Sequence, residues 1–130
     1  MYMKPEEIRE FFAKDRFAEM TGIEILEVRE GYAKTKIDVE DKHLNANNVV
    51  MGGCIYTLAD YTFALAANCG ELRSKTLSSS IVFNSPANGK VLYAETEIIK
   101  NGRTICNFLV RITDEKNRTV ATANVMGYRD

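Results

Sequence analysis

The stretch from residue 52 to residue 68, GGCIYTLADYTFALAAN, decides the fold of this chain. It has the composition of a helix that is apolar on nearly every side, and such a helix has to be covered on several sides. Its one charged residue is Asp60. An ionised carboxylate among apolar side chains is costly unless it is paired, hydrogen-bonded or neutralised by a raised pKa. Because acid–base chemistry near neutral pH also requires a raised pKa, Asp60 is the first candidate for a catalytic residue.

The segments outside this helix are mostly patterned as strands. Residues 23–39 suggest two strands, separated at Gly31, each with one solvent-exposed face. Four longer alternating runs follow the helix, at residues 76–84, 90–100, 103–113 and 118–128. They are separated by Asn88-Gly89, by Asn101-Gly102 and by residues 114–117, and Asn-Gly between alternating runs is the strongest short hairpin signal. The second half is therefore predicted to be an antiparallel meander of long, curved strands.

Two flanking segments complete the predicted order. Pro5 and the two acids after it begin a short helix that is expected to run to about Ala18. Residues 40–51 form a polar connection into the central helix, which is expected to end near Gly70 as a C-cap. One long antiparallel sheet folded round one helix satisfies all these patterns. We therefore expect an α+β protein with the hotdog fold, in a single domain over residues 1–130.

Composition narrows the function classes. At 130 residues and 45% hydrophobic, the chain can bury a real core. Its 17 basic and 18 acidic residues are interspersed, so no footprint for nucleic acid or an anionic membrane is visible. Three cysteines without C-x-x-C spacing and a single histidine predict no disulfide framework and no metal site. With no secretory signal and no apolar run of ~20 residues, a soluble, cytoplasmic protein is expected.

Gly52 and Gly53 open the central helix with free amides. The first N–H groups of a helix have no intrahelical partner and lie at the positive end of its dipole. Without side chains in the way, a substrate oxygen can approach them closely. Two interpretations stay open: an oxyanion hole for charge that develops on a carbonyl oxygen, or glycines that only allow close packing at the helix entrance.

The spacing between Gly52 and Asp60 has a consequence for assembly. Eight residues of helix separate them, which is ~12 Å along the axis, so one carbonyl group cannot contact both. If both act on one substrate, Gly52 of one subunit must meet Asp60 of another, on two antiparallel helices in a two-fold dimer. A homodimer is then required for catalysis, with two equivalent sites, and a homotetramer is the expected assembly.

Three further residues have a functional and a structural interpretation each. Asn45 could position a water or hold the substrate, or be a turn residue in the approach loop. His43 could act as a general base, or be a solvated loop histidine. Cys54 in the first helical turn could be a nucleophile with a depressed pKa, or a small buried cysteine.

The pattern His43-x-Asn45-x6-Gly52-Gly53-x5-Ala59-Asp60 resembles the signature of the PaaI-like group of hotdog acyl-CoA thioesterases. The segment 83–87, the Gly102-Arg103 turn and the Val120-Ala121 strand are similar to the same family, so the resemblance covers about residues 20–128. It implies hydrolysis of an acyl-CoA thioester with no cofactor apart from the coenzyme A of the substrate. It also implies that Asp60 is the general base or nucleophile, that the Gly52 amide binds the thioester carbonyl, and that Asn45 helps to place the water.

The chain departs from this family at one position. Many members carry histidine directly before the two glycines, where this chain has Met51. An adaptable methionine could line the pocket instead, together with Tyr56 and Phe63. In relatives, a hydroxyl from the strand after the helix often supports the catalytic water, and the matching position here is nearest Thr76. Ser78 and Ser80 are expected to share its strand face by alternation, although all three could simply be polar strand residues.

Other roles stay open beside thioester hydrolysis. The chain could be an acyl-CoA binding or sensing module without catalysis. It could also be a dehydratase or hydratase, but these enzymes pair an acid with an active-site histidine, and His43 is badly placed for that. The coenzyme A phosphates could meet cations that are otherwise solvated at strand ends, namely Lys90, Lys100, Arg103 and Arg129.

Overall fold

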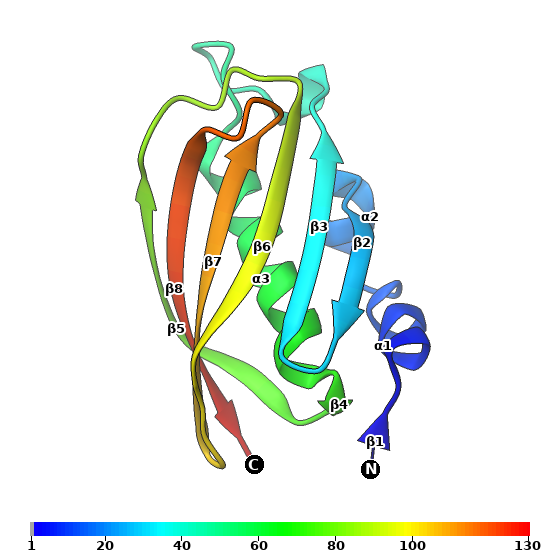
Figure 1. Cartoon of the computed structure of the whole chain (residues 1–130). Helices are drawn as coiled ribbons and strands as arrows, with labels where there is room; N and C mark the ends of the chain where they lie inside the picture. The colour runs from blue at the N-terminus through cyan, green and yellow to red at the C-terminus, as the bar shows by residue number, and fades with distance from the viewer. Residues whose placement is uncertain (1) are drawn as a thin grey trace.

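A six-stranded antiparallel sheet curves around one central helix, α3 (Gly52–Asn68), in the computed structural model (Figure 1). The structure describes residues 2–130, so Met1, the first residue of the predicted single domain, lies outside the described residues. The strands of this sheet are β2 (Glu24–Arg29), β3 (Tyr32–Asp38), β5 (Ser74–Phe83), β6 (Val91–Asn101), β7 (Ile105–Asp114) and β8 (Thr119–Arg129). The fold class predicted from the sequence is confirmed.

Helix α3 is the core of the molecule because the sheet covers it on several sides. Ten of its residues are buried, and its contacts extend to β3, β5, β6, β7 and β8. Phe63, only 1% exposed, packs edge-on against Phe108 of β7 with 5.5 Å between the ring centroids. The suggestion that Phe63 lines a substrate pocket is therefore wrong, because its ring fills the space between α3 and the sheet.

The strand order is β2-β3-β6-β7-β8-β5, which differs from the predicted meander at one strand. The Asn101-Gly102 hairpin between β6 and β7 and the turn between β7 and β8 are confirmed. The Asn88-Gly89 hairpin is wrong, because β5 pairs with β8 while β6 pairs with β3. The segment 84–90 crosses the end of the sheet instead. It is held there by contacts distant in sequence, such as the bond from the Val50 amide to the Ala87 carbonyl at 2.9 Å.

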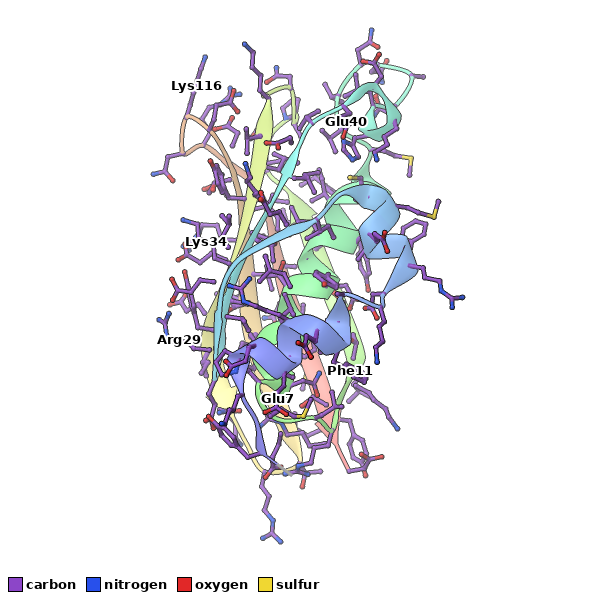
Figure 2. The ribbon with its side chains drawn as sticks, turned by 90° about the vertical axis from the view of Figure 1, so that its right-hand side faces the viewer. Glu7, Phe11, Arg29, Lys34, Glu40 and Lys116 are labelled. Atoms are coloured by element: carbon purple, nitrogen blue, oxygen red, sulfur yellow. The ribbon has the colours of Figure 1, made fainter. Side chains whose placement is uncertain are left out.

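The predicted N-terminal helix is two short helices, α1 (Pro5–Phe12) and α2 (Arg16–Thr21). The chain turns between them because Asp15 is extended, with φ of −72° and ψ of 98°. Both helices contact α3, across which they lie in Figure 2. The Tyr61 hydroxyl of α3 donates a 2.9 Å hydrogen bond to the carbonyl of Phe12, which ties the end of α1 to the central helix.

Two small elements at the ends of α3 were not predicted. A 3₁₀ turn, η1 (Asp41–His43), lies in the connection that leads to Gly52. Beyond the helix, β1 (Tyr2–Met3) and β4 (Gly70–Glu71) form a two-stranded sheet. Helix α3 ends at Asn68, and Cys69 rather than Gly70 occupies the cap position, while Gly70 has a left-handed φ of 98°. Among residues 2–130, no helix has the length and apolar character that a bilayer crossing needs.

Candidate active site

Asp60 lies on the open side of α3 and is half-buried, so its charge is not enclosed in the core. Thr76 of β5 donates a hydrogen bond from its hydroxyl to Oδ1 of Asp60 at 3.0 Å. Within residues 2–130, no donor is found for the other carboxylate oxygen, Oδ2. The hydroxyl therefore orients the carboxylate and leaves Oδ2 available to a water or a substrate.

A β-bulge decides which hydroxyls of β5 face α3. Thr76 pairs with Gly127, but Ser78 already pairs with Met126, so one extra residue lies between the two pairs. A slip of one residue moves every later side chain to the opposite face. The prediction that Ser78 and Ser80 share the face of Thr76 is therefore wrong, because they point to the outer side of the sheet. Ser79, which pairs with buried Val125, lies on the inner face.

A cleft of about 620 Å³ opens beside Asp60. One wall is a stripe of α3 and the other is the α1–α2 turn with the first residues of α2. The α3 stripe supplies Tyr56, Thr57, Asp60, Tyr61 and Ala64, and the second wall supplies residues 14–18. The expectation that Tyr56 faces a pocket agrees with its position in this cleft. Asp60 lies midway along the α3 stripe, between aromatic and small side chains.

Two neighbouring groups respond to the electrostatics of this cleft. Partial burial, and next the charge of Asp60, raise the pKa of Asp15. Burial, and next the charge of Asp15, raise the pKa of Tyr61 to about 12. Tyr61 is therefore a neutral hydrogen-bond donor at ordinary pH, and Asp15 and Asp60 are close enough to influence each other.

The start of α3 carries the second half of the candidate site. The Met51 carbonyl accepts bonds from the amides of Cys54 at 3.0 Å and Ile55 at 3.2 Å. The amides of Gly52 and Gly53 precede these first bonds, and in the part of the chain that the structure describes we find no acceptor for either. They are free donors at a helix N-terminus, the position where a carbonyl oxygen or an anion is best stabilised.

Side chains near these glycines limit the space around them. A methyl group on Gly52 would lie 3.1 Å from the ring of Phe83, and one on Gly53 would lie 2.8 Å from the terminal methyl of Met51. Met51 is 53% exposed and Phe83 is 52% exposed, so both can move when a ligand binds. Only glycine leaves the amides accessible without displacing these neighbours.

Asn45 has a structural task, and within residues 2–130 its side-chain Nδ2 group has no acceptor. Its side-chain oxygen accepts bonds from the amides of Asn47 at 2.8 Å and Val49 at 3.3 Å, which closes the loop before α3. Because this oxygen is already used, the side-chain Nδ2 group is what remains to bind a water. Asn45 can therefore serve both interpretations, as a turn residue and as a donor to a water oxygen.

His43 is buried and fully bonded. Its Nδ1 accepts a bond from the Glu40 amide at 2.9 Å, so the ring hydrogen is on Nε2, which donates to the Thr21 carbonyl at 2.7 Å. The expectation of a solvated histidine is wrong, because the ring is only 4% exposed. No ring nitrogen is free to act as a general base, and His43 instead connects η1 to the end of α2.

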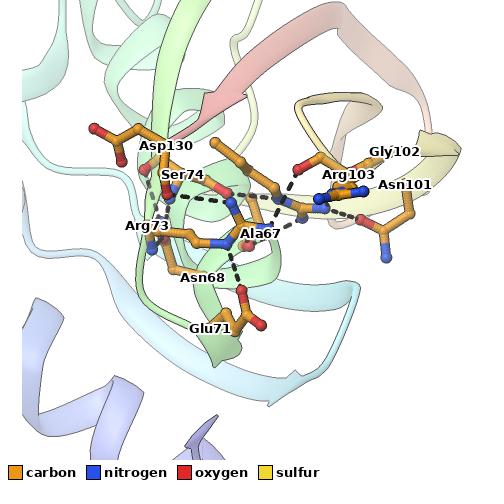
Figure 3. A network of polar contacts seen from close by, with 10 residues as sticks. Ala67, Asn68, Glu71, Arg73, Ser74, Asn101, Gly102, Arg103 and Asp130 are labelled. Carbon is orange, nitrogen blue, oxygen red and sulfur yellow. Dashed lines mark hydrogen bonds and ion pairs between the residues drawn. The ribbon is translucent and has the colours of Figure 1, made fainter. Parts of the chain in front are cut away.

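Two other candidates also have structural roles. Burial raises the pKa of the Cys54 thiol despite the opposing charge of Lys42, which disfavours a thiolate nucleophile. Arg129 donates to Ser74 Oγ, Asn101 Oδ1 and the carbonyls of Ala67 and Gly102, at distances of 2.6 to 3.2 Å. These bonds join β8 to the start of β5, the end of α3 and the β6–β7 hairpin, and Figure 3 labels the four residues that accept them, Ala67, Ser74, Asn101 and Gly102. Four of its five N–H donors are occupied within the protein, so Arg129 is poorly suited to hold a coenzyme A phosphate.

One chain therefore presents two separate sets of candidate site residues. The first set consists of the Asp60 carboxylate and the Thr76 hydroxyl that bonds it, beside the cleft. The second set consists of hydrogen-bond donors, the Asn45 side chain and the amides of Gly52 and Gly53. None of these three residues lines that cleft. Nor do residues 2–130 contain a cluster of three or more histidine, cysteine or acidic side chains suited to a metal ion.

The sheet wrapped round a single helix defines the class of this molecule as a hotdog-fold protein. Comparison with known proteins narrows this class. The family model described as the thioesterase superfamily matches residues 47–121. A putative esterase of Archaeoglobus fulgidus is 35% identical over 126 residues, which are 95% of this chain and 82% of the relative.

Two further comparisons concern a named thioesterase and a complex with coenzyme A. The acyl-coenzyme A thioesterase PaaI of Escherichia coli is 29% identical over 85% of this chain and 79% of its own length. A solved structure of the E. coli PaaI protein has a TM-score of 0.86 at 25% identity, covering 94% of this chain and 89% of that chain. A hypothetical thioesterase of Streptococcus pneumoniae, solved with coenzyme A, has a TM-score of 0.82 at 28% identity, covering 93% and 95%. The chain therefore belongs to the thioesterase superfamily, in its PaaI-like group, and is a thioester hydrolase, so the predicted family and enzyme class are confirmed.

Proposed function

We propose that this chain hydrolyses acyl-CoA thioesters, with Asp60 as general base or nucleophile and coenzyme A present only as part of the substrate. The observation that carries the proposal is the Thr76–Asp60 hydrogen bond beside a cleft of about 620 Å³, since it orients a carboxylate toward a space of ligand size. The similarity to E. coli PaaI and to a thioesterase solved with coenzyme A supports this substrate class.

In the general-base route, Asp60 takes a proton from a water as the water oxygen bonds to the thioester carbon. The amide of Gly52 stabilises the negative charge on the carbonyl oxygen, and Nδ2 of Asn45 donates to the water. The carbon–sulfur bond then breaks, and the thiolate of coenzyme A receives the proton from Asp60. In the alternative route, the Asp60 carboxylate attacks the carbon itself, and the carbon–sulfur bond breaks to release the coenzyme A thiolate. Water then hydrolyses the resulting mixed anhydride to the free acid and the Asp60 carboxylate, and the proton that it loses goes to the thiolate.

The proposed site is assembled from two copies of the chain. Gly52 and Asp60 lie on the same helix, eight residues and ~12 Å apart, so they cannot meet at one carbonyl group. In a two-fold dimer with antiparallel α3 helices, Gly52 of one copy approaches Asp60 of the other, and two sites form. We propose this homodimer as the smallest active unit and a homotetramer of two such dimers as the assembly.

Thiol release from a panel of aryl and fatty acyl-CoAs tests this function. We expect Asp60→Asn to lower turnover by at least about a hundredfold. Glu97→Gln is the matched control, because it removes one carboxylate from the exposed part of β6 and should leave turnover unchanged. If wild type and Asp60→Asn are equally inert while acyl-CoA raises the melting temperature of both, the chain is a binding module and not an enzyme.

Single-turnover hydrolysis in ¹⁸O-labelled water separates the two routes. The mixed-anhydride route transfers label into the Asp60 carboxylate when water attacks the Asp60 carbon of the anhydride, whereas the general-base route never labels Asp60, so labelled Asp60 excludes the general-base route. Mass spectrometry of the peptide that contains Asp60 reads the difference directly.

A further inference from the structure

The wall of the cleft opposite Asp60 is made by the turn between α1 and α2 and the start of α2. This wall faces the viewer in Figure 2, in front of α3. It contributes one aromatic side chain, Phe17, which is 68% exposed, and α3 contributes Tyr56, which is 39% exposed. Large aromatic side chains left open on both walls give the cleft an apolar character suited to the acyl part of a substrate.

Asp15 places a second carboxylate beside the aromatic side chains of this cleft. It occupies the N-cap position of α2, where an aspartate usually accepts a bond from the helix amides, yet its side chain makes no capping bond. Among residues 2–130 it also forms no ion pair. Asp15 is thus a carboxylate without a structural partner that lines the same space as Asp60.

Two cations line the same cleft, and among residues 2–130 neither forms an ion pair with Asp15. Lys14 also lines the cleft, but its ammonium lies 5.9 Å from the ring centroid of Phe11, on the α1 side of the turn. Arg16 begins α2 and forms no salt bridge with Asp15 or Asp60 in the described part of the chain. The raised pKa of Asp15, caused by burial and then by Asp60, agrees with two carboxylates that repel each other across the cleft.

We propose that Asp15 is a specificity-determining residue that rejects acyl groups ending in a carboxylate and admits uncharged ones. This inference rests on the proposed function, in which Asp60 marks the position in the cleft where the thioester reacts. A third carboxylate brought between Asp15 and Asp60 would lose water and meet two like charges, which is strongly unfavourable. An uncharged chain of the same length would contact the exposed aromatic side chains of both walls and would add no negative charge to the cleft.

The test compares two acyl-CoAs of equal chain length, hexanoyl-CoA and adipoyl-CoA, which differ at the end of the chain by a carboxylate. For wild type, kcat/KM for hexanoyl-CoA should exceed that for adipoyl-CoA by at least about tenfold. Asp15→Asn should narrow this ratio by at least about tenfold, since asparagine is an equally good N-cap and lacks the charge. Glu19→Gln is the matched control, because it removes one negative charge from an exposed position of α2 that does not line the cleft.

Three outcomes would overturn the proposal: a preference of wild type for adipoyl-CoA, an unchanged ratio in Asp15→Asn, or an equal change in Glu19→Gln. Calorimetric binding of the matching thioether analogues measures the ratio of their two dissociation constants, which reports the same preference without turnover. If wild type hydrolyses neither thioester but binds the hexanoyl analogue more tightly in an Asp15-dependent way, the proposed catalysis fails and the specificity role stands. If wild type hydrolyses the thioesters and the ratio is the same in Asp15→Asn, the proposed catalysis stands and the specificity role fails.

Discussion

The Thr76 hydroxyl lies 3.0 Å from Oδ1 of Asp60, and this bond joins the edge strand β5 to the carboxylate of the central helix. The bond can form because Thr76 lies before the β-bulge of β5. Its side chain therefore faces α3, whereas the residues after the bulge change face. The carboxylate is therefore held by a neutral donor on one oxygen, and among residues 2–130 its second oxygen has no donor, beside the cleft that Asp60 lines. Thr76 is a positioning residue in this arrangement, since it acts through Asp60.

Thr76→Val should lower kcat roughly tenfold, because valine keeps the β-branched shape and removes the donor, a loss of about 1.4 kcal/mol in the transition state. Thr76→Ser should restore most of the activity, since it keeps the hydroxyl. Steady-state kinetics with one acyl-CoA measures both variants, and the melting temperature monitors their folding. Equal activity of the valine and serine variants would show that the bond does not position Asp60.

Two glycine substitutions should separate activity from stability. Gly52→Ala places a methyl group where the carbonyl must approach, 3.1 Å from an exposed Phe83 ring that can move. We expect it to lower turnover at least about thirtyfold, in the range for loss of an oxyanion donor, and to change the free energy of unfolding by less than about 1 kcal/mol. Turnover and urea unfolding of the same preparation give the two numbers.

Gly127→Ala is the opposite case. Its methyl group would lie 2.7 Å from the Phe63 ring and 2.8 Å from the Cys106 sulfur, both enclosed in the core. Overpacking of this kind should cost about 1–3 kcal/mol of unfolding free energy, while the activity per folded molecule changes little. An unaffected turnover in Gly52→Ala would remove the oxyanion assignment, and an unaffected stability in Gly127→Ala would contradict the close packing of α3 against the sheet.

His43→Leu should lower stability rather than catalysis. Leucine fits the buried space but leaves the Glu40 amide and the Thr21 carbonyl without the ring nitrogens that bond them. We expect a loss of about 1–3 kcal/mol in urea unfolding. Asn47→Ala, in the exposed part of the same loop, should change stability by less than about 0.5 kcal/mol. A large loss of turnover in His43→Leu without a loss of stability would return His43 to the list of possible bases.

Asp114 should make stability depend on acid pH. The Arg118 amide, then the Arg118 guanidinium and the Lys116 amide, hold the pKa of Asp114 below its ordinary value although its burial opposes them. When the pKa of a carboxyl group is lower in the folded state, its charge stabilises the fold at pH values above the unfolded-state pKa of about 4. This stabilisation is lost as the pH falls through the folded-state pKa. The stability difference between wild type and Asp114→Asn should therefore be complete at pH 6 and shrink toward pH 3 in urea titrations. A difference that stays constant over this range would contradict the role of the charge.

Much of this molecule could be predicted because it depends on local patterns. The apolar composition of residues 52–68 requires a covered helix, and the alternation in four long runs requires strands, so the hotdog architecture follows from both. Asp60 could be singled out because it is the only charge in that helix. The thioesterase family could be predicted from the spacing of Asn45, the paired glycines and Asp60.

The remaining features depend on contacts between distant segments. Asn88-Gly89 is a valid hairpin signal, but β5 pairs with β8, and nothing local specifies that partner. The bulge between Thr76 and Ser78 leaves no trace in a run of three serines, so alternation assigned Ser78 and Ser80 to the wrong face. Asp15 could not be connected with Asp60 before the structure, because the docking of the α1–α2 turn against α3 brings them together.

In the proposed dimer, each active site takes Gly52 from one chain and Asp60 from the other. Asp60→Asn and Gly52→Ala, nearly inactive alone, should be unfolded, mixed in equal amounts and refolded together, and thiol release from one acyl-CoA measured. In random mixing half of the dimers are mixed, and each mixed dimer has one site free of both substitutions, so roughly a quarter of wild-type activity should return. Activity no higher than the mean of the two variants refolded separately would show that Gly52 and Asp60 do not act across a dimer interface.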